Sequence, residues 1–275
     1  MLRQFSKNIF FTAVVLYLLA CGLIYAFQTW LLFPSYATAP VPSDWQPSIS
    51  NHDVQTFLKG QCGQLHAVYW KAPNDKGTLM IFHGNAESIS SVQDYVPWIQ
   101  KFGYSVMSWD YAGYGKSTHC LFGNQDKLLT DAETAYEWLA SLTPPEKISL
   151  FGRSIGTGLA IHVASQHDVH QLILVSLYDS LAKVAADYIP TIIPTKLLTN
   201  YPIPAYQWIA QVKAPIYAIH GAIDTLIKPA YAQNLIADAP TYHGVKPSLT
   251  IVANAGHNVA PFSSYKQWLT QILQQ

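Results

Sequence analysis

Charged residues are scarce in this 275-residue chain. Only 12% of its residues are Asp, Glu, Lys or Arg, and the formal net charge is +0; an ordinary soluble domain has about 25%. The balanced charge excludes the basic surface typical of a nucleic-acid-binding protein. Internal repeats and low-complexity tracts are missing as well, and half of the residues are hydrophobic. We therefore expect one folded α/β domain with a full core and no nucleic-acid partner.

Cysteines and ligand motifs are equally sparse. The three cysteines, Cys21, Cys62 and Cys120, are too far apart in sequence to form a metal-binding motif. No Gly-x-Gly-x-x-Gly follows a first strand, and no His, Cys and carboxylate cluster has zinc spacing. We therefore expect neither a cofactor nor a metal. No Asn-x-Ser/Thr sequence occurs, so nothing supports a glycosylated lumenal protein.

One long segment accounts for part of the low charge. Residues 9–33 contain no charged side chain over 25 positions, and about 20 apolar residues span a bilayer core. Arg3 and Lys7 precede this segment, and the next charge is Asp44. The positive-inside tendency therefore predicts a single-pass anchor with a cytoplasmic N-terminus and a periplasmic or otherwise extracytoplasmic catalytic domain. A cleaved signal peptide and a lipoprotein site at Cys21 are the alternatives.

The rest of the chain divides into a linker and one domain. We expect an N-terminal tail at residues 1–8, the anchor at 9–33, a linker rich in Pro, Ser and Ala at 34–50, and a domain at 51–275. Within that domain, strand-like and helix-like segments alternate, which predicts a mostly parallel central sheet with helices on both faces. Residues 177–213 interrupt the alternation, and we interpret them as a short, mostly helical lid over the sheet's top edge.

A serine between two glycines lies where a strand becomes a helix. The sequence Gly152-Arg153-Ser154-Ile155-Gly156 follows the apolar run Ile-Ser-Leu-Phe and precedes a helix-like stretch. In a sharp strand-to-helix turn, the two glycines relieve steric crowding and the serine hydroxyl is exposed as a nucleophile. The alternative is a plain tight turn that tolerates any residue between its glycines.

A serine nucleophile needs a base, and the base needs an acid that orients it. In parallel sheets, ligands bind beyond the carboxyl ends of the strands, so we look for both residues just after later strands. Asp224 and His257 lie at such positions, and Ser154, Asp224, His257 is the chain order of a nucleophile-elbow enzyme. The other nine histidines fall in helices, at the opposite end of the sheet, before the serine or in turns. Asp179 is the alternative acid.

Two backbone N–H groups are candidates for an oxyanion hole. The N–H of Ile155 lies at the start of the helix after the serine. The second donor should come from the loop after the strand Thr-Leu-Met-Ile-Phe, where the chain has His83-Gly84-Asn85, and we assign it to Asn85. A plain glycine turn is the alternative interpretation of this loop.

Taken together, these motifs resemble the α/β-hydrolase superfamily, and within it the Bem46-type membrane-anchored serine hydrolases. The matching pieces are FHGNAES, WDYAGYGKS, LFGRSIGTGLA, SLYDSLAKVAADYIP, IHGAIDTLIKP and NAGHN, in the order of the family and over about residues 53–270. The resemblance implies Ser154 as nucleophile, His257 as base and Asp224 as acid. The chain departs from the family at Ser176-Leu177, where members usually have Ser-Pro, so the path into the lid can differ.

The resemblance also implies hydrolysis of an ester or thioester. The lid contributes apolar and aromatic residues that favour an acyl, lipid-like small-molecule substrate, or that only pack the lid against the domain; they are Ile189, Ile192, Ile193, Leu197, Leu198, Tyr201 and Tyr206. A serine peptidase with the same triad, a catalytically degenerate membrane-tethered interaction protein and a secreted esterase remain open alternatives.

The state of two cysteines depends on the compartment. Two free, half-buried thiols are the default expectation for Cys62 and Cys120. In this fold, however, the turn before the second strand and the loop after Asp-Tyr-Ala-Gly-Tyr-Gly lie at the same edge. The two cysteines could therefore form a disulfide in an extracytoplasmic domain, with Cα atoms within about 7 Å.

Overall fold

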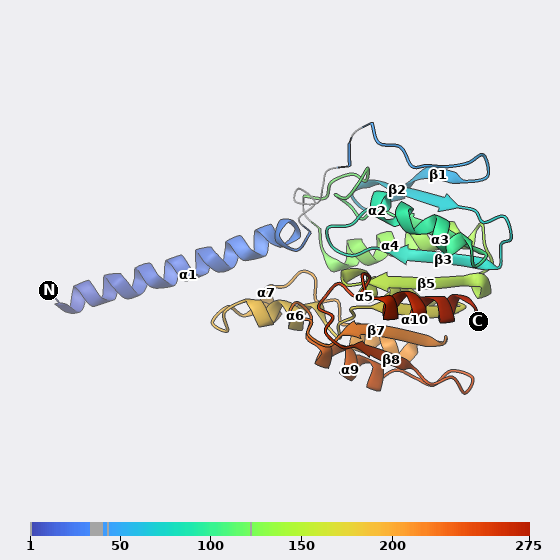
Figure 1. Cartoon of the computed structure of the whole chain (residues 1–275). Helices are drawn as coiled ribbons and strands as arrows, with labels where there is room; N and C mark the ends of the chain where they lie inside the picture. The colour runs from blue at the N-terminus through green and yellow to red at the C-terminus, as the bar shows by residue number, and fades with distance from the viewer. Residues whose placement is uncertain (1, 34–40, 43, 122) are drawn as a thin grey trace.

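An eight-stranded sheet forms the centre of the protein in the computed structural model (Figure 1). The structure describes residues 2–33, 41–42, 44–121 and 123–275, without the side chains of residues 2–4, 196 and 197. The strand order is β1-β2-β4-β3-β5-β6-β7-β8, and the pairs β1–β2 and β2–β4 are antiparallel while all the others are parallel. The strands are β1 (Val54–Gly60), β2 (Gly63–Trp70), β3 (Gly77–Phe82), β4 (Tyr104–Trp109), β5 (Ile148–Arg153), β6 (Gln171–Val175), β7 (Ile216–Gly221) and β8 (Ser248–Val252).

Helices cover both faces of this sheet. They are α2 (Ile89–Val92), α3 (Val96–Gln100), α4 (Gln125–Ala140), α5 (Ile155–Gln166), α6 (Leu181–Tyr188), α7 (Thr195–Leu198), α8 (Ala205–Trp208), α9 (Pro229–Ala237) and α10 (Ser263–Leu273). Short 3₁₀ turns lie at Gln93–Tyr95, Pro145–Lys147 and Ile209–Gln211. The predicted α/β-hydrolase type of architecture, with a mostly parallel sheet between two helical layers, is confirmed.

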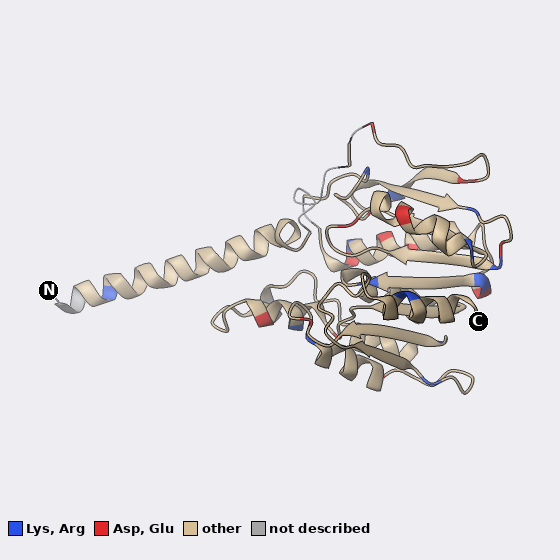
Figure 2. Ribbon diagram, in the orientation of Figure 1, with Lys and Arg blue, Asp and Glu red and all other residues tan. Residues whose placement is uncertain are grey.

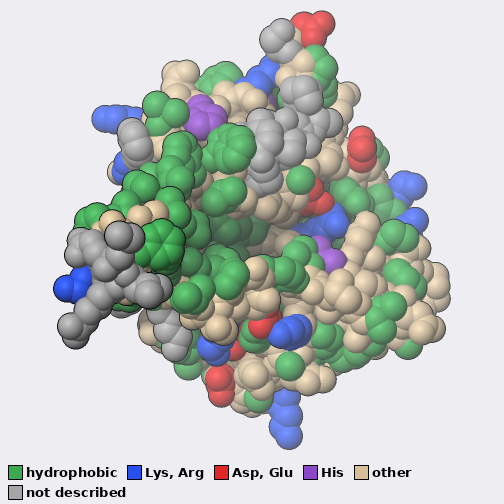
Figure 3. Space-filling view, turned by 90° about the vertical axis from the view of Figure 1, so that its left-hand side faces the viewer, with side chains coloured by type: hydrophobic (Ala, Val, Ile, Leu, Met, Phe, Trp, Pro, Cys, Tyr) green, Lys and Arg blue, Asp and Glu red, His purple; other side chains and the backbone are tan. Residues whose placement is uncertain are grey.

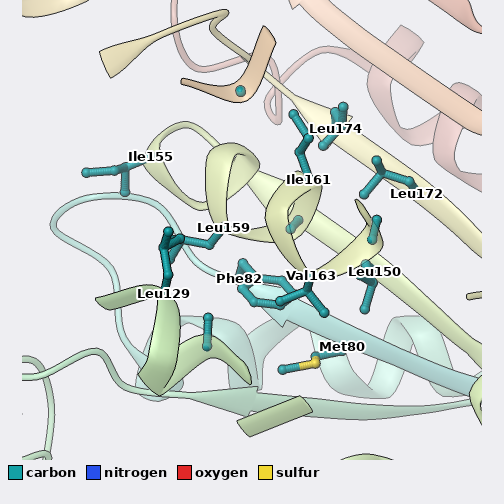
Figure 4. Packing of buried hydrophobic residues seen from close by; sticks show 14 of the residues in the cluster. Met80, Phe82, Leu129, Leu150, Ile155, Leu159, Ile161, Val163, Leu172 and Leu174 are labelled. Atoms are coloured by element: carbon teal, nitrogen blue, oxygen red, sulfur yellow. The ribbon is translucent and has the colours of Figure 1, made fainter. Parts of the chain in front are cut away.

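Alternation along the buried strands divides the core between the two faces. Met80 and Phe82 of β3 point into one hydrophobic cluster, in which they meet residues of α4 and α5 (Figure 4). Leu79 and Ile81 of the same strand point into the other cluster, beneath α2, α3 and α10. Because both faces of β3 are covered, the strand is apolar throughout, as expected for a central parallel strand. This core fixes the carboxyl ends of the strands relative to one another.

One predicted helix is broken. The sequence pattern predicts a helix over residues 87–101 with a kink or break at Pro97. The structure has α2, a 3₁₀ turn and α3 in its place, with Pro97 in the first turn of α3. A proline is tolerated there because a first-turn N–H has no partner within the helix.

The N-terminal segment is one long helix, α1 (Leu2–Leu32). It projects away from the domain, and its ribbon is almost free of charge (Figures 1 and 2). Its stretch Phe5–Leu32 is long and apolar enough to cross a membrane, and little of it is buried against the protein. Eight of the 17 residues of the predicted linker, 34–40 and 43, lie outside the described residues, and the predicted domain boundaries stay predictions.

The excursion after β6 is less helical than expected. Over residues 177–213 the helices α6, α7 and α8 alternate with proline-containing turns. Four of these residues are prolines that interrupt helical hydrogen bonding: Pro190, Pro194, Pro202 and Pro204. The excursion extends from the domain on the side from which α1 projects (Figure 1).

The default expectation of two free thiols is wrong. Cys62 and Cys120 form a disulfide, with their Cα atoms 5.3 Å apart. The bond joins the β1–β2 turn to the loop that follows β4, because the antiparallel pairing of β2 with β4 brings these two segments to one edge. Cys21, in α1, is a free and buried cysteine.

Candidate active site

Ser154 occupies the turn between β5 and α5. Its backbone has φ 51° and ψ −121°, a left-handed conformation that is costly for a residue with a side chain. The N–H of Ser154 donates to the carbonyl of Val175 at 2.8 Å, which holds the turn against the end of β6. The serine hydroxyl is thereby directed away from the sheet while the surrounding backbone compensates for the strained conformation.

The two flanking glycines are required by close backbone contacts. A Cβ at Gly152 would come within 2.7 Å of the Cα of Thr157. A Cβ at Gly156 would clash with the carbonyl oxygen of Phe82 and lie 2.7 Å from that of His83. The start of α5 therefore packs directly against the end of β3. This contact places the N-terminus of α5 beside the loop that contains Asn85.

His257 joins the serine to an acid. Its Nε2 lies 2.9 Å from the Oγ of Ser154, and its Nδ1 lies 2.8 Å from the Oδ2 of Asp224. The three residues follow β5, β7 and β8, so the carboxyl edge of the sheet brings together positions that are distant in sequence. With Nδ1–H donating to the carboxylate, Nε2 is free to accept the serine proton.

Asp224 is buried, at 4% exposure, and fully paired. Its Oδ1 accepts from the N–H groups of Leu226 and Ile227, each at 2.9 Å, and its Oδ2 lies 3.2 Å from Nε2 of His220 as well as beside His257. Burial alone would raise the pKa of Asp224, but the hydrogen bonds from His220, His257 and Ile227 hold it well below its usual range. The acid is therefore an oriented carboxylate at neutral pH.

The alternative acid has another partner. Asp179 is buried, and its Oδ2 accepts a hydrogen bond from the Nζ of Lys183 at 2.6 Å, one turn later in sequence. Of the two candidates, Asp224 contacts the imidazole of His257, whereas Asp179 is bonded to Lys183.

The two predicted oxyanion donors lie on neighbouring segments. Within the described residues, neither the N–H of Ile155 nor that of Asn85 has a protein acceptor. The turn before Asn85 is held from several sides: Nδ1–H of His83 donates to the Gly84 carbonyl at 2.9 Å, and the Tyr111 hydroxyl donates to the His83 carbonyl at 2.7 Å. Burial lowers the pKa of His83, so this imidazole is neutral. Both N–H groups are available to a developing negative charge.

The side chain of Asn85 connects this turn to α1. Its Nδ2 donates to the carbonyl of Leu32 at 2.8 Å, and its Oδ1 accepts from the Tyr114 hydroxyl. The last turn of the apolar helix is therefore in contact with the loop that presents a candidate oxyanion donor. Helix α1 is thus in direct contact with the domain at Asn85.

Sequence reasoning missed two supporting side chains. Arg153 forms an ion pair with Glu87. The other carboxylate oxygen of Glu87 accepts from the N–H of Gly84 at 2.6 Å. Arg153 also donates to Oδ1 of Asn258 at 3.1 Å. One guanidinium thus links the elbow, the His-Gly-Asn turn and the loop of His257. Its place inside the Gly-x-Ser-x-Gly motif is the signal that could have indicated this role.

The second missed residue is Ser176, for which the sequence indicates only a departure from the family pattern. It has a left-handed backbone, with φ 54°, and its Oγ donates to the carbonyl of His257 at 2.7 Å. The hydroxyl therefore holds the histidine loop against the end of β6.

Within the residues that the structure describes, no group of three or more His, Cys, Asp or Glu side chains converges to hold a metal ion.

Comparisons with known proteins identify the superfamily to which this fold belongs. A family described as serine aminopeptidase S33 matches residues 73–198. An uncharacterised protein of Mycobacterium tuberculosis is 30% identical, over 83% of this chain and 79% of its own. Human alpha/beta hydrolase domain-containing protein 17B is 28% identical, over 85% of this chain and 80% of its own. This chain belongs to the α/β-hydrolase superfamily.

A solved structure supports the fold of this hydrolase independently. The esterase Pf2001 of Pyrococcus furiosus superposes with a TM-score of 0.64, covering 86% of this chain and 96% of its own, at 21% identity. At that identity the likeness concerns the fold alone. The inference about chemistry rests instead on the contacts of His257 with Ser154 and Asp224 in this protein.

Proposed function

We propose that this α/β-hydrolase is a membrane-anchored serine hydrolase of the Bem46 type, which cleaves an acyl ester or thioester through an acyl-enzyme. The single observation that carries the proposal is the imidazole of His257, which lies within hydrogen-bonding distance of both the Ser154 hydroxyl and the Asp224 carboxylate. Nucleophilic catalysis by a serine uses all three of these groups: an exposed serine, an imidazole that accepts its proton and an acid that orients the imidazole.

The reaction follows from this geometry. Nε2 of His257 takes the proton of Ser154 while Oγ attacks the carbonyl carbon of the substrate, and the N–H groups of Ile155 and Asn85 stabilise the oxyanion. His257 then passes its proton to the departing alcohol or thiol, which leaves the acyl group on Ser154. Water attacks the acyl-enzyme, again with His257 as base, and releases the acid. Asp224 keeps Nδ1 protonated and stabilises the imidazolium in both halves.

An acyl substrate is supported by a cavity of about 570 Å³ beside α1. It lies between the end of α1 and the loop after β4, and its lining is apolar, with Phe27, Phe33 and Leu121 among the contributors. The Phe33 ring contacts that of Tyr114 with centroids 6.4 Å apart, and the Tyr114 hydroxyl donates a hydrogen bond to Oδ1 of Asn85. An alkyl chain in this cavity would extend toward the oxyanion turn.

The membrane location rests on α1 and on the disulfide. Helix α1 has the length and composition of a single span, and Lys7 precedes its uncharged part, which favours a cytoplasmic N-terminus. The Cys62–Cys120 bond supports an oxidising compartment for the catalytic domain, since disulfides are rare in the cytosol. An extracytoplasmic domain satisfies both observations.

The test uses Ser154→Ala in the full-length protein. We expect this variant to lose turnover of a p-nitrophenyl ester, by about 10³-fold or more, and labelling by a fluorophosphonate probe, while its thermal unfolding is unchanged. Ser141→Ala is the matched control, because Ser141 is exposed at the end of α4 and donates only to a helix carbonyl. Normal turnover by Ser154→Ala would contradict the assignment.

A peptidase is the second candidate, because the matching family is described as serine aminopeptidase S33. Amide and ester hydrolysis use the same triad, so the geometry of Ser154 does not separate them. Aminoacyl p-nitroanilides and p-nitrophenyl esters presented to the same preparation do so. We expect kcat/KM to be higher for the esters, and a preference for the anilides would favour the peptidase.

A further inference from the structure

Residues 188–200, which we call the excursion tip, lie along the half of α1 nearest the domain. The Tyr17 hydroxyl donates to the carbonyl of Ile192 at 2.8 Å. Eleven residues further along α1, the buried Gln28 donates to the carbonyl of Leu198 and accepts from the N–H of Asn200 at 2.6 Å. Eleven helical residues span about 16 Å. The tip therefore follows α1 for several turns, as the neighbouring ribbons of α1 and α7 indicate (Figure 1).

The surface of the tip is apolar and exposed. Ile192, beside Tyr17 of α1, is 71% exposed, and Tyr188, at the base of the tip, is 57% exposed. Between Asp187 and Lys213 the sequence has one charged residue, Lys196, which belongs to the tip. Hydrophobic side chains also gather on the molecular face from which α1 projects (Figure 3). A continuous exposed apolar surface of this kind marks a protein or membrane contact.

Within the described residues, most of the backbone N–H groups of the tip are satisfied by the protein, with those of Thr191 and Ile192 among the exceptions. Two of its residues, Pro190 and Pro194, have no N–H to satisfy. The N–H of Ile193 donates to the Pro190 carbonyl at 2.9 Å, and that of Leu198 donates to the Pro194 carbonyl at 3.1 Å. The N–H of Asn200 donates to the side chain of Gln28 in α1. Irregular backbone enters lipid only where its polar groups are satisfied by protein.

The position of Tyr17 sets the depth of the tip. The uncharged stretch of α1 covers residues 9–33, and the hydrocarbon core takes about 20 helical residues. Every window of that length within 9–33 includes Tyr17. If α1 spans the membrane, the carbonyl of Ile192, bonded to Tyr17, lies inside the hydrocarbon.

We propose that the excursion tip enters the hydrocarbon region of the bilayer beside α1. The proposal rests on the proposed membrane anchoring, and its partner is the acyl-chain region of the lipids. The base of the tip is tied to the catalytic edge, because the Tyr188 hydroxyl donates to the carbonyls of Thr225 and Leu226, next to Asp224. The tip thus holds the site against the membrane surface, where an acyl ester dissolved in the bilayer reaches Ser154 without crossing water.

Spin labels on single cysteines test the depth. The full-length Cys21→Ala protein receives Ile192→Cys, Leu16→Cys or Leu142→Cys and is reconstituted into vesicles of phosphatidylcholine and phosphatidylglycerol. Leu16 is an exposed position of α1, and Leu142 is an exposed position after α4, far from the tip. The measurement is the accessibility of each label to oxygen, which concentrates in lipid, and to a water-soluble nickel complex.

We expect the label at Ile192 to resemble that at Leu16, with high oxygen and low nickel accessibility, and the label at Leu142 to report water. An aqueous label at Ile192 together with a lipid-exposed label at Leu16 would overturn the proposal while leaving the anchor intact. Aqueous labels at both positions would overturn the anchor, and the tip's insertion with it. Neither result depends on hydrolase activity.

Activity gives a second measurement. A charge within the hydrocarbon is costly, so Ile192→Asp should lower kcat/KM about tenfold for p-nitrophenyl palmitate in vesicles. For water-soluble p-nitrophenyl acetate the same variant should stay within about twofold of wild type, as expected for an exposed substitution. Ile192→Val is the matched control and should preserve both rates. Equal rates for Ile192→Asp and wild type on the vesicle substrate would argue against insertion.

Discussion

The candidate catalytic edge of this hydrolase and the side that we propose to face the membrane depart from the usual pattern of burial in opposite ways. At the catalytic edge, charged and polar groups such as Asp224 and His220 are buried. On the proposed membrane-facing side, Phe10 and Ile192 are apolar and exposed. Each departure needs compensation: buried polar groups need hydrogen-bond partners, and exposed apolar groups need an apolar partner, which the proposed membrane would supply. The compensation at the catalytic edge is within the protein, whereas that of the other side is in its surroundings.

Asp224→Asn should break the catalytic edge with the largest effect. The amide can donate to Nδ1 of His257 and so favour the wrong imidazole tautomer, while the geometry is nearly unchanged. We expect kcat for a p-nitrophenyl ester to fall about 10³- to 10⁴-fold. Asp179→Asn is the matched control, since Asp179 is paired with Lys183, and it should change kcat by no more than about twofold. A comparable loss in both variants would contradict the assignment.

The same carboxylate should make stability depend on pH. Because the pKa of Asp224 is lower in the folded protein than in the unfolded chain, its contribution to stability is fully present above about pH 4. That contribution is lost as pH falls toward the folded pKa, because the unfolded chain then binds the extra proton. The difference in unfolding free energy between wild type and Asp224→Asn should therefore shrink on acidification. Parallel curves would mean that the acid is not held as an anion.

The disulfide, which joins the β1–β2 turn to the loop after β4 beside the end of α1, should have the next largest effect when it is removed. The bond closes a sequence separation of 58, which corresponds to roughly 4 kcal/mol in the chain-entropy account. Cys62→Ser with Cys120→Ser should lower the unfolding free energy by about 2–4 kcal/mol, measured by urea in detergent. Dithiothreitol should destabilise wild type but leave the double variant unchanged. A wild type insensitive to the reductant would show that the pair is not oxidised.

The catalytic edge could be predicted from sequence because local rules specify it. Gly152 and Gly156 mark a strand-to-helix turn, and residues that follow parallel strands meet at one edge, which is why Ser154, Asp224 and His257 were selected correctly as neighbours. Their catalytic role stays a prediction. Local rules also explain why a break near Pro97 could be foreseen.

What escaped prediction depends on contacts between distant segments. The link from Arg153 to Glu87 and Asn258 spans 105 positions at its longest. The contact of Asn85 with Leu32 joins a turn to a helix that sequence reasoning treated as a separate anchor. No local periodicity or motif indicates such pairs, because each side chain is compatible with its own helix, strand or turn whether or not the distant partner is present. The tip's alignment with α1 escaped prediction for the same reason.

Two glycine substitutions sharpen the comparison with the smallest expected effects. Gly156→Ala places a Cβ against the carbonyl oxygens of Phe82 and His83, and backbone cannot move aside as a flexible side chain does. We expect a loss of about 1–3 kcal/mol in the free energy of unfolding. We also expect a lower kcat, because the added methyl group would move the turn of Asn85 away from the N–H of Ile155, its proposed partner in the oxyanion hole.

Gly22→Ala is the matched change in α1, where a Cβ has nothing within 4 Å. Alanine favours helix over glycine by about 1 kcal/mol, so this variant should be as stable as wild type or slightly more so, with unchanged kcat. Thermal unfolding and ester hydrolysis in the same detergent compare the two. The packed edge resists an added methyl group because its space is filled by protein, whereas α1 should accept one because no protein atom lies within 4 Å of that position. Equal destabilisation by both variants would show that α1 is packed against protein at Gly22 and would remove the distinction between the two regions.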